Sequence, residues 1–187
     1  MLRFYVFDQS EARPEWSLKE SFLVGKGGSV LVGTPIWKKG IVECASKLRE
    51  PYGLALRWKV SESQSYLLQT CLLAPREKPY VLSLELARHR IKVFLDKCES
   101  WQMFSLDDAH PAMKSWEKAR EIFVEAIAAR DEIESDRLAT KSLLLGIEAT
   151  DHLAIAHADI LFRKRYRDSS ASIGTLGVQI NHNDRGE

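Results

Sequence analysis

Several features that usually reveal a protein's function are scarce or absent in this sequence. It carries 27 basic and 26 acidic residues and a formal net charge of only +1, so no overall field attracts nucleic acid or an anionic membrane. No apolar run approaches the length of a membrane span, and the apolar start at residues 2–7 is too short for a signal peptide. We therefore expect a cytoplasmic protein without nucleic-acid or membrane partners.

Cysteine is also scarce. Cys44, Cys71 and Cys98 are three in number, widely separated, and set in segments that have the pattern of a core. Such residues are most simply reduced, buried thiols of a cytoplasmic protein. A single disulfide stays open as the alternative if the chain is exported.

Recognisable catalytic and metal-binding motifs are missing. The glycine-rich residues 25–28 lack the Lys-Ser/Thr ending of a phosphate loop and do not lead from a strand into a helix, which favours a hairpin turn. His152 and His157 are five positions apart, whereas the metalloprotease arrangement needs four and an adjacent glutamate. The basic run at residues 163–167 suits either phosphate contacts or an exposed helix end. We expect no cofactor, no metal and no catalytic residue within this chain.

Glycine is nearly absent between residues 79 and 167, where Gly146 stands alone. Apolar residues there recur three and four apart, which predicts three helices: residues 82–101, a second from His110-Pro111 to about residue 130, and a third from about residue 135 to 167. The predicted apolar stripes are Leu84, Ala87, Ile91, Phe94, Cys98 and Trp101, then Met113, Trp116, Ala119, Phe123, Ala126 and Ile127, then Leu138, Leu145, Ala149, Leu153, Ala156 and Ile160.

The third predicted helix is unusually long. At 1.5 Å per residue it reaches roughly 45 Å, which is more than two shorter helices can cover, so part of it should pack on something else. Gly146 in its interior should cost about 1 kcal/mol relative to alanine. We expect a packing reason or a local bend at this position.

The first 75 residues have a different pattern. Six short apolar or alternating segments separated by turn residues predict strands at residues 2–7, 21–25, 30–37, 41–46, 53–60 and 66–73. Residues 74–79 form the best linker candidate. The fold class predicted is α+β: an N-terminal antiparallel β-sandwich, similar in layout to carbohydrate-binding modules, then a three-helix segment and one isolated C-terminal strand.

The C-terminal strand is predicted over residues 173–180, after a small polar linker. A lone strand needs a sheet to join, so it either returns to the N-terminal sheet or begins a further domain. The predicted organisation is a sandwich domain at residues 1–75, a three-helix segment at 76–168, and a linker with a first strand at 169–187.

Five tryptophans are many for this length. Trp101 and Trp116 fit the helical stripes. Trp16, Trp37 and Trp58 lie on or near the strands, where buried rings fill volume and exposed rings stack on sugars. Two or more of these three in an exposed row would favour glycan binding.

Several segments resemble a known family. The residues concerned are 80–90 (YVLSLELARHR), 98–104 (CESWQMF), His157-Ala158-Asp159 and 176–181 (LGVQIN). Together they resemble the N-terminal, non-catalytic region of large bacterial proteins of glycoside hydrolase family 10, the endo-β-1,4-xylanase family. The resemblance covers about residues 80–181, and over the first 75 residues it concerns layout alone.

This resemblance implies that residues 173–180 are the first strand of the family's (β/α)₈ barrel. Family members are retaining glycosidases with two barrel glutamates, which belong to later strands and have no counterpart here. Asn181 and His182 follow this strand, and the resemblance implies that they are candidates for substrate contact. The alternative is that they are ordinary loop residues.

The function we expect is therefore that of an accessory region of a family 10-like enzyme acting on β-1,4-linked polysaccharide such as xylan. Its partners would be the barrel and a polysaccharide or oligosaccharide, the latter bound through Trp16, Trp37 and Trp58. The alternative is a non-catalytic protein-interaction module that binds a partner on the long third helix.

Overall fold

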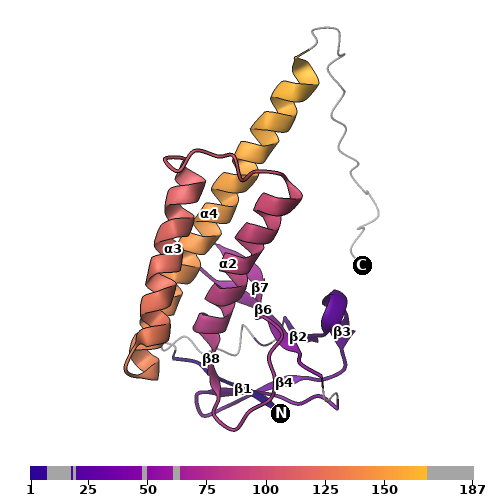
Figure 1. Cartoon of the computed structure of the whole chain (residues 1–187). Coiled ribbons are helices and arrows are strands. Elements are labelled where there is room, and N and C mark those ends of the chain that lie inside the picture. The colour runs from indigo at the N-terminus through magenta and orange to yellow at the C-terminus, as the bar shows by residue number, and fades with distance from the viewer. Residues whose placement is uncertain (8–17, 19, 48–49, 61–63, 168–187) are drawn as a thin grey trace, which may run out of the picture.

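The structure is a computed structural model that describes residues 1–7, 18, 20–47, 50–60 and 64–167. Two small four-stranded sheets form one end of the molecule, and three helices rise from them (Figure 1). The α+β class predicted from the sequence is confirmed. The sheets are open and one strand pair is parallel, so the antiparallel sandwich is not confirmed.

The first sheet has the order β4-β5-β1-β8, made from β4 (Pro35–Lys38), β5 (Ile41–Cys44), β1 (Leu2–Tyr5) and β8 (Tyr80–Val81). Adjacent strands are antiparallel except β1 and β8, which run parallel. The second sheet is antiparallel throughout and has the order β3-β2-β6-β7: β3 (Val30–Leu31), β2 (Ser21–Val24), β6 (Gly53–Lys59) and β7 (Ser65–Gln69). The turn predicted at residues 25–28 is the short 3-10 helix η1 (Lys26–Gly28) between β2 and β3.

The strand predicted over residues 30–37 is wrong as a single element. It divides into β3 and β4, which belong to different sheets. Gly33 lies between them with φ 157°, and a Cβ there would come within 2.5 Å of the Ala45 carbonyl oxygen and 2.6 Å of Leu23 Cδ1. The chain therefore crosses between the sheets at a position where only glycine fits.

The helices follow the apolar stripes closely. They are α2 (Leu82–Ser100), α3 (Pro111–Ala128) and α4 (Glu132–Tyr166). The imidazole of His110 caps α3 by accepting a hydrogen bond from the Ala112 amide at 3.2 Å, with Pro111 in the first turn. Two members of the stripes depart from prediction, since Ile127 and Ile160 are 53% and 48% exposed. Ile122, which the stripe of α3 omits, is buried.

Helix α4 begins earlier than predicted. Asp131 caps it by accepting from the Glu134 amide at 2.8 Å. Ser135 is of a residue type favoured at helix N-caps. It lies inside the helix instead, and its hydroxyl donates to the Ala126 carbonyl of α3 at 2.9 Å. Ser142 repeats this contact to the Ala119 carbonyl at 2.7 Å, so two buried hydroxyls join α3 to α4.

One core joins the sheets to the helices. Leu2 and Phe4 from the first sheet, and Leu54 from the second, share a buried cluster with Leu86 of α2 and Leu143 of α4. Tyr52 anchors it: its hydroxyl accepts from the Leu2 amide at 3.0 Å and donates to the Cys44 carbonyl at 2.8 Å. This core extends across the boundary predicted at residue 75.

A second cluster lies within the helical bundle. Phe94 and Cys98 of α2 pack with Ala149 and Leu153 of α4, and Trp116 of α3 stacks on Phe94 with ring centroids 5.3 Å apart. Gly146 is buried where α2 crosses α4, and a Cβ there would lie 3.2 Å from Cγ of Arg90. The packing reason expected for Gly146 is therefore the close approach of the Arg90 side chain.

The three cysteines are free thiols, as expected. Cys44 and Cys98 are buried, and burial raises the pKa of the Cys44 thiol to about 12. Cys71 is only half-buried, which corrects the prediction of full burial. No helix of the described part of the chain is long and apolar enough to span a bilayer.

Candidate functional site

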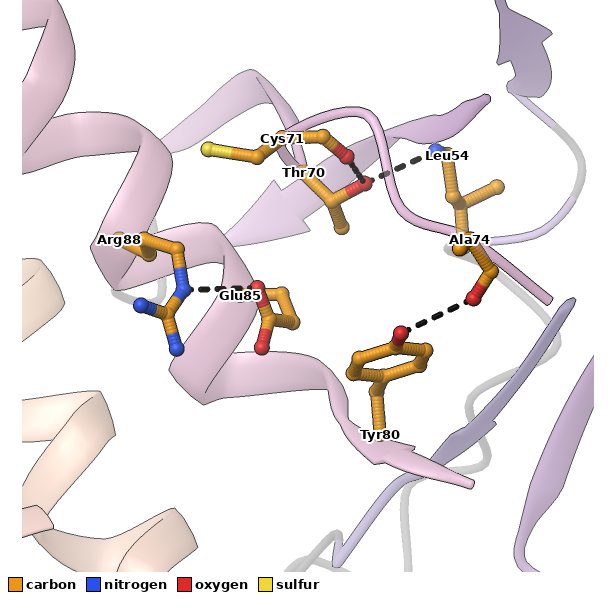
Figure 2. A network of polar contacts seen from close by, with 7 residues as sticks. All are labelled: Leu54, Thr70, Cys71, Ala74, Tyr80, Glu85 and Arg88. Carbon is orange, nitrogen blue, oxygen red and sulfur yellow. Dashed lines mark hydrogen bonds and ion pairs between the residues drawn. The ribbon is translucent and has the colours of Figure 1, made fainter. Parts of the chain in front are cut away.

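Polar contacts lie in the second sheet, in the linker that follows it and in the first turns of α2 (Figure 2). Thr70 at the end of β7 is 1% exposed, and its hydroxyl accepts from the Leu54 amide at 3.1 Å and donates to the Cys71 carbonyl at 2.9 Å. The side chain therefore takes the place of a backbone partner where the strand pairing stops.

Tyr80 fixes the linker that leads into α2. Its hydroxyl donates to the Ala74 carbonyl at 2.9 Å, and the Arg76 guanidinium lies 3.6 Å above its ring centre. This linker, predicted from its prolines and charges, therefore continues into β8, which pairs with β1.

Glu85 is the most deeply buried charged residue in the described part of the chain, at 3% exposure. Its Oε2 accepts from Nε of Arg88 at 3.0 Å, and the Arg88 guanidinium lies 5.2 Å from the Phe123 ring centre. A carboxylate in the first turn of α2 also interacts favourably with the helix dipole. Sequence reasoning missed this pair, because adjacent residues point about 100° apart on a helix and the two flanking leucines do not show which way Glu85 faces.

A pocket of about 260 Å³ lies beside Glu85, between the linker and the turn from α3 to α4. Arg76, Lys78 and Arg130 contribute cations to its wall. Lys78 is paired with Glu132 at 2.7 Å, which holds the pKa of that carboxyl below its usual range. Glu85, Asp131 and Glu132 contribute as many carboxylates to the same wall, so its charges balance and indicate no particular ligand.

A further polar cluster lies where β7 meets α2 and α4. Nε2 of Gln69 and Nε2 of His89 are 2.9 Å apart, and burial lowers the pKa of His89 to about 4. The Tyr66 hydroxyl donates to Oδ2 of Asp151 at 3.3 Å, and this carboxylate raises the pKa of the phenol. These contacts position the elements against each other. Within the described ranges, no three His, Cys, Asp or Glu side chains are grouped to hold a metal ion.

The predicted glycan-binding tryptophans are separated by the fold. Trp37 lies on β4 of the first sheet and Trp58 on β6 of the second, and both are half-buried against the shared core. Trp16, Asn181 and His182, like the strand predicted over residues 173–180, lie outside the described residues. The two rings that are described do not form a row on one sheet, and glycan binding stays a prediction.

The end of α4 differs from the rest of the molecule. Leu153 is its last buried residue, and residues 154–166 are here called the α4 extension. Ala156 still packs on the bundle, and the helix then continues past the ends of α2 and α3 (Figure 1). Ile155, Leu161 and Phe162 of this extension are 67%, 52% and 63% exposed. Of the sixteen large apolar side chains exposed in the described residues, four lie within residues 155–162.

The point where α4 leaves the bundle is marked by a ring stack. His157 of α4 lies parallel to Trp101 at the end of α2, with centroids 4.6 Å apart and planes 4° apart. Nζ of Lys97 lies 5.4 Å from the centre of the same indole ring. His157 therefore packs against the residue that ends α2.

Comparison with known proteins gives no further guide to function. No protein-family model matches the chain, no curated protein matches it, and no solved structure matches its fold.

Proposed function

We propose that this chain is a non-catalytic interaction module that works through the α4 extension. The observation that carries the proposal is the exposure of Ile155, Leu161 and Phe162 on a helix that projects beyond its own bundle. Contiguous exposed apolar side chains on a soluble domain commonly mark a contact surface. A partner on this surface would be the additional packing contact that the length of the helix predicts.

The other polar groups support a structural role. Glu85 is paired with Arg88, and Lys78 with Glu132. Thr70 and Tyr80 are each engaged with backbone carbonyls. The Lys78–Glu132 pair joins the linker to α4, and the other contacts lie within α2, the second sheet or the linker. We assign no chemical step to any of them.

A more specific form of the proposal rests on the resemblance to glycoside hydrolase family 10. In this form the module is an accessory region beside a (β/α)₈ barrel that acts on xylan or a similar β-1,4-linked polysaccharide. In the sequence, helix α4 is followed by a small polar linker and then by the residues that resemble the first barrel strand, so its exposed surface would lie near that domain. Hydrolysis would then belong to barrel glutamates outside this sequence, and barrel strands encoded downstream of Glu187 would support this form.

Photo-crosslinking tests the module proposal directly. The photoreactive residue p-benzoylphenylalanine would replace Phe162 in the α4 extension or, as a matched control, Val124 of α3, which is similarly exposed at 60%. The proposal predicts a crosslinked species from position 162 in the producing cells and none from position 124. Equal yields at both positions, or none at either, would contradict it.

Glycan binding by the strands is a separate test. Calorimetric titration of the chain with xylo-oligosaccharides, repeated for Trp37→Ala and Trp58→Ala, measures it directly. Heat of binding that each substitution abolishes supports a sugar site, and no heat from the unsubstituted chain removes glycan binding from the proposal.

A further inference from the structure

The α4 extension, together with Asp151 one turn before it, carries a regular pattern of exposed residues. Asp151 also accepts a hydrogen bond from the Tyr66 hydroxyl at 3.3 Å. Asp151, Ala158 and Arg165 are seven residues apart, and so are Ile155 and Phe162. All five are exposed. At about 100° per residue they fall within roughly 80° of one another around the helix, which is the narrow seam of a two-helix contact. The seam is acidic at its start, small at its centre and basic at its end.

We propose that the α4 extension pairs with the same helix of a second copy of this chain, running antiparallel, with Ala158 next to the two-fold axis. The inference rests on the proposed function, because it names the partner of the same surface. In this register Ile155 packs against Phe162 of the second copy, and Asp151 lies opposite Arg165 of the second copy. Two-fold symmetry repeats both contacts on the other side of the axis.

Charge decides between this arrangement and its alternative. An antiparallel pair brings each Asp151 to an Arg165, whereas a parallel pair in register would bring aspartate to aspartate and arginine to arginine. Opposite charges across such a seam set orientation, and like charges there are unfavourable. A small residue at the centre also lets the two backbones approach closely. Two copies of the seam that run in opposite directions are thus complementary in charge.

The size of the contact sets its strength. From residue 151 to residue 165 the seam runs about 21 Å along the helix, which is about four turns. A contact of this length should bury less area than a standard protein interface. We therefore expect a dissociation constant in the micromolar range. The fraction of dimer should rise with protein concentration and fall with added salt.

Sedimentation equilibrium of the full chain tests the inference, at concentrations from about 1 μM to about 1 mM. Each of Asp151→Arg and Arg165→Asp replaces two attractive contacts with two repulsive ones, and should weaken dimerisation about tenfold or more. The combined variant restores both contacts with their signs exchanged, and should return to within about threefold of the original affinity. Lys141→Glu, an exposed reversal on α4 outside the seam, should leave the affinity unchanged.

The outcomes separate the two proposals. A chain that stays monomeric at every concentration, or single reversals that change nothing, overturns the second-copy inference. Asp151→Arg also removes the contact of Asp151 with Tyr66, whereas Arg165→Asp leaves it intact. A weaker dimer in Arg165→Asp therefore cannot result from loss of that contact. Crosslinking from position 162 to a different polypeptide would keep the interaction module and refute the second copy, whereas no crosslinking at all would refute both.

Discussion

Two leucines on α4 allow the same substitution to be made inside and outside the core. Leu143 is 0% exposed and packs in the cluster shared by both sheets and α2, whereas Leu161 in the α4 extension is 52% exposed. Both changes to alanine remove the same atoms from the same helix, and alanine suits a helix as well as leucine does. The difference in stability between the variants therefore reports burial alone.

The magnitudes differ widely. Leu143→Ala removes a fully buried side chain at the junction of three elements and should cost about 3 kcal/mol in the free energy of unfolding, within the range of about 2–5 kcal/mol for such changes. Leu161→Ala should change it by less than about 0.5 kcal/mol, as for surface substitutions. For a chain of this size, the first loss corresponds to a fall in Tm of roughly 6–12 °C.

Urea and thermal unfolding followed by circular dichroism at low protein concentration measure both variants, with tryptophan fluorescence as a second probe. Dilution matters because association through the α4 extension would itself stabilise the chain. The two probes should give coincident transitions for Leu143→Ala, since its cluster joins sheets and helices. Equal costs for the two leucines would refute the placement of the α4 extension outside the core.

Three further changes probe the polar contacts and the thiols. Thr70→Val removes the hydroxyl that accepts from the buried Leu54 amide and should lower the free energy of unfolding by about 1–3 kcal/mol, measured by urea unfolding. Thr70→Ser keeps a hydroxyl and should lower it less. Equal losses in the two variants would show that the hydroxyl does not matter. His89 has a pKa lowered to about 4 by burial, so the unfolded chain binds more protons between about pH 6.5 and 4 and stability falls as pH drops through this window. After allowance for solvent screening, unfolding at pH 5 should cost about 1 kcal/mol less than at pH 7, and His89→Gln should abolish this difference; an unchanged pH dependence in that variant would assign the effect elsewhere. Cys71 is the only half-buried thiol of the three, so a thiol reagent should label it first in the native chain, and labelling of Cys44 at the same rate would contradict the buried position of that side chain.

The helices were the most predictable part of this fold. Apolar residues spaced three and four apart are a local signal of a helix, and so is the His110-Pro111 start. Tertiary packing then buries the same side chains. Ile160 departs from its stripe for a reason that lies outside its own sequence window: α2 and α3 end before α4 does. Periodicity identifies the apolar face of a helix, but the lengths of its neighbours decide how much of that face is covered.

The strands were less predictable because their pairing depends on distant residues. Residues 30–37 read as one apolar run, and only the approach of Ala45 and Leu23 at Gly33 divides it between two sheets. Strand β8 has two residues and exists because β1 lies beside it. The role of Thr70 was missed for the same reason, since the Leu54 amide that it accepts from lies 16 residues earlier in the chain. The Glu85–Arg88 pair is local, but only the packing around α2 decides that Glu85 is buried.

Amide hydrogen exchange along α4 tests the central claim most directly, because it measures protection residue by residue in the intact chain. In dilute solution, residues 139–153 should exchange slowly and residues 155–166 rapidly, with the boundary near Leu153. Raising the protein concentration should then slow exchange across residues 151–165. Uniform protection up to Tyr166 in a chain shown to be monomeric would contradict the claim that this end of the helix is free to bind a partner.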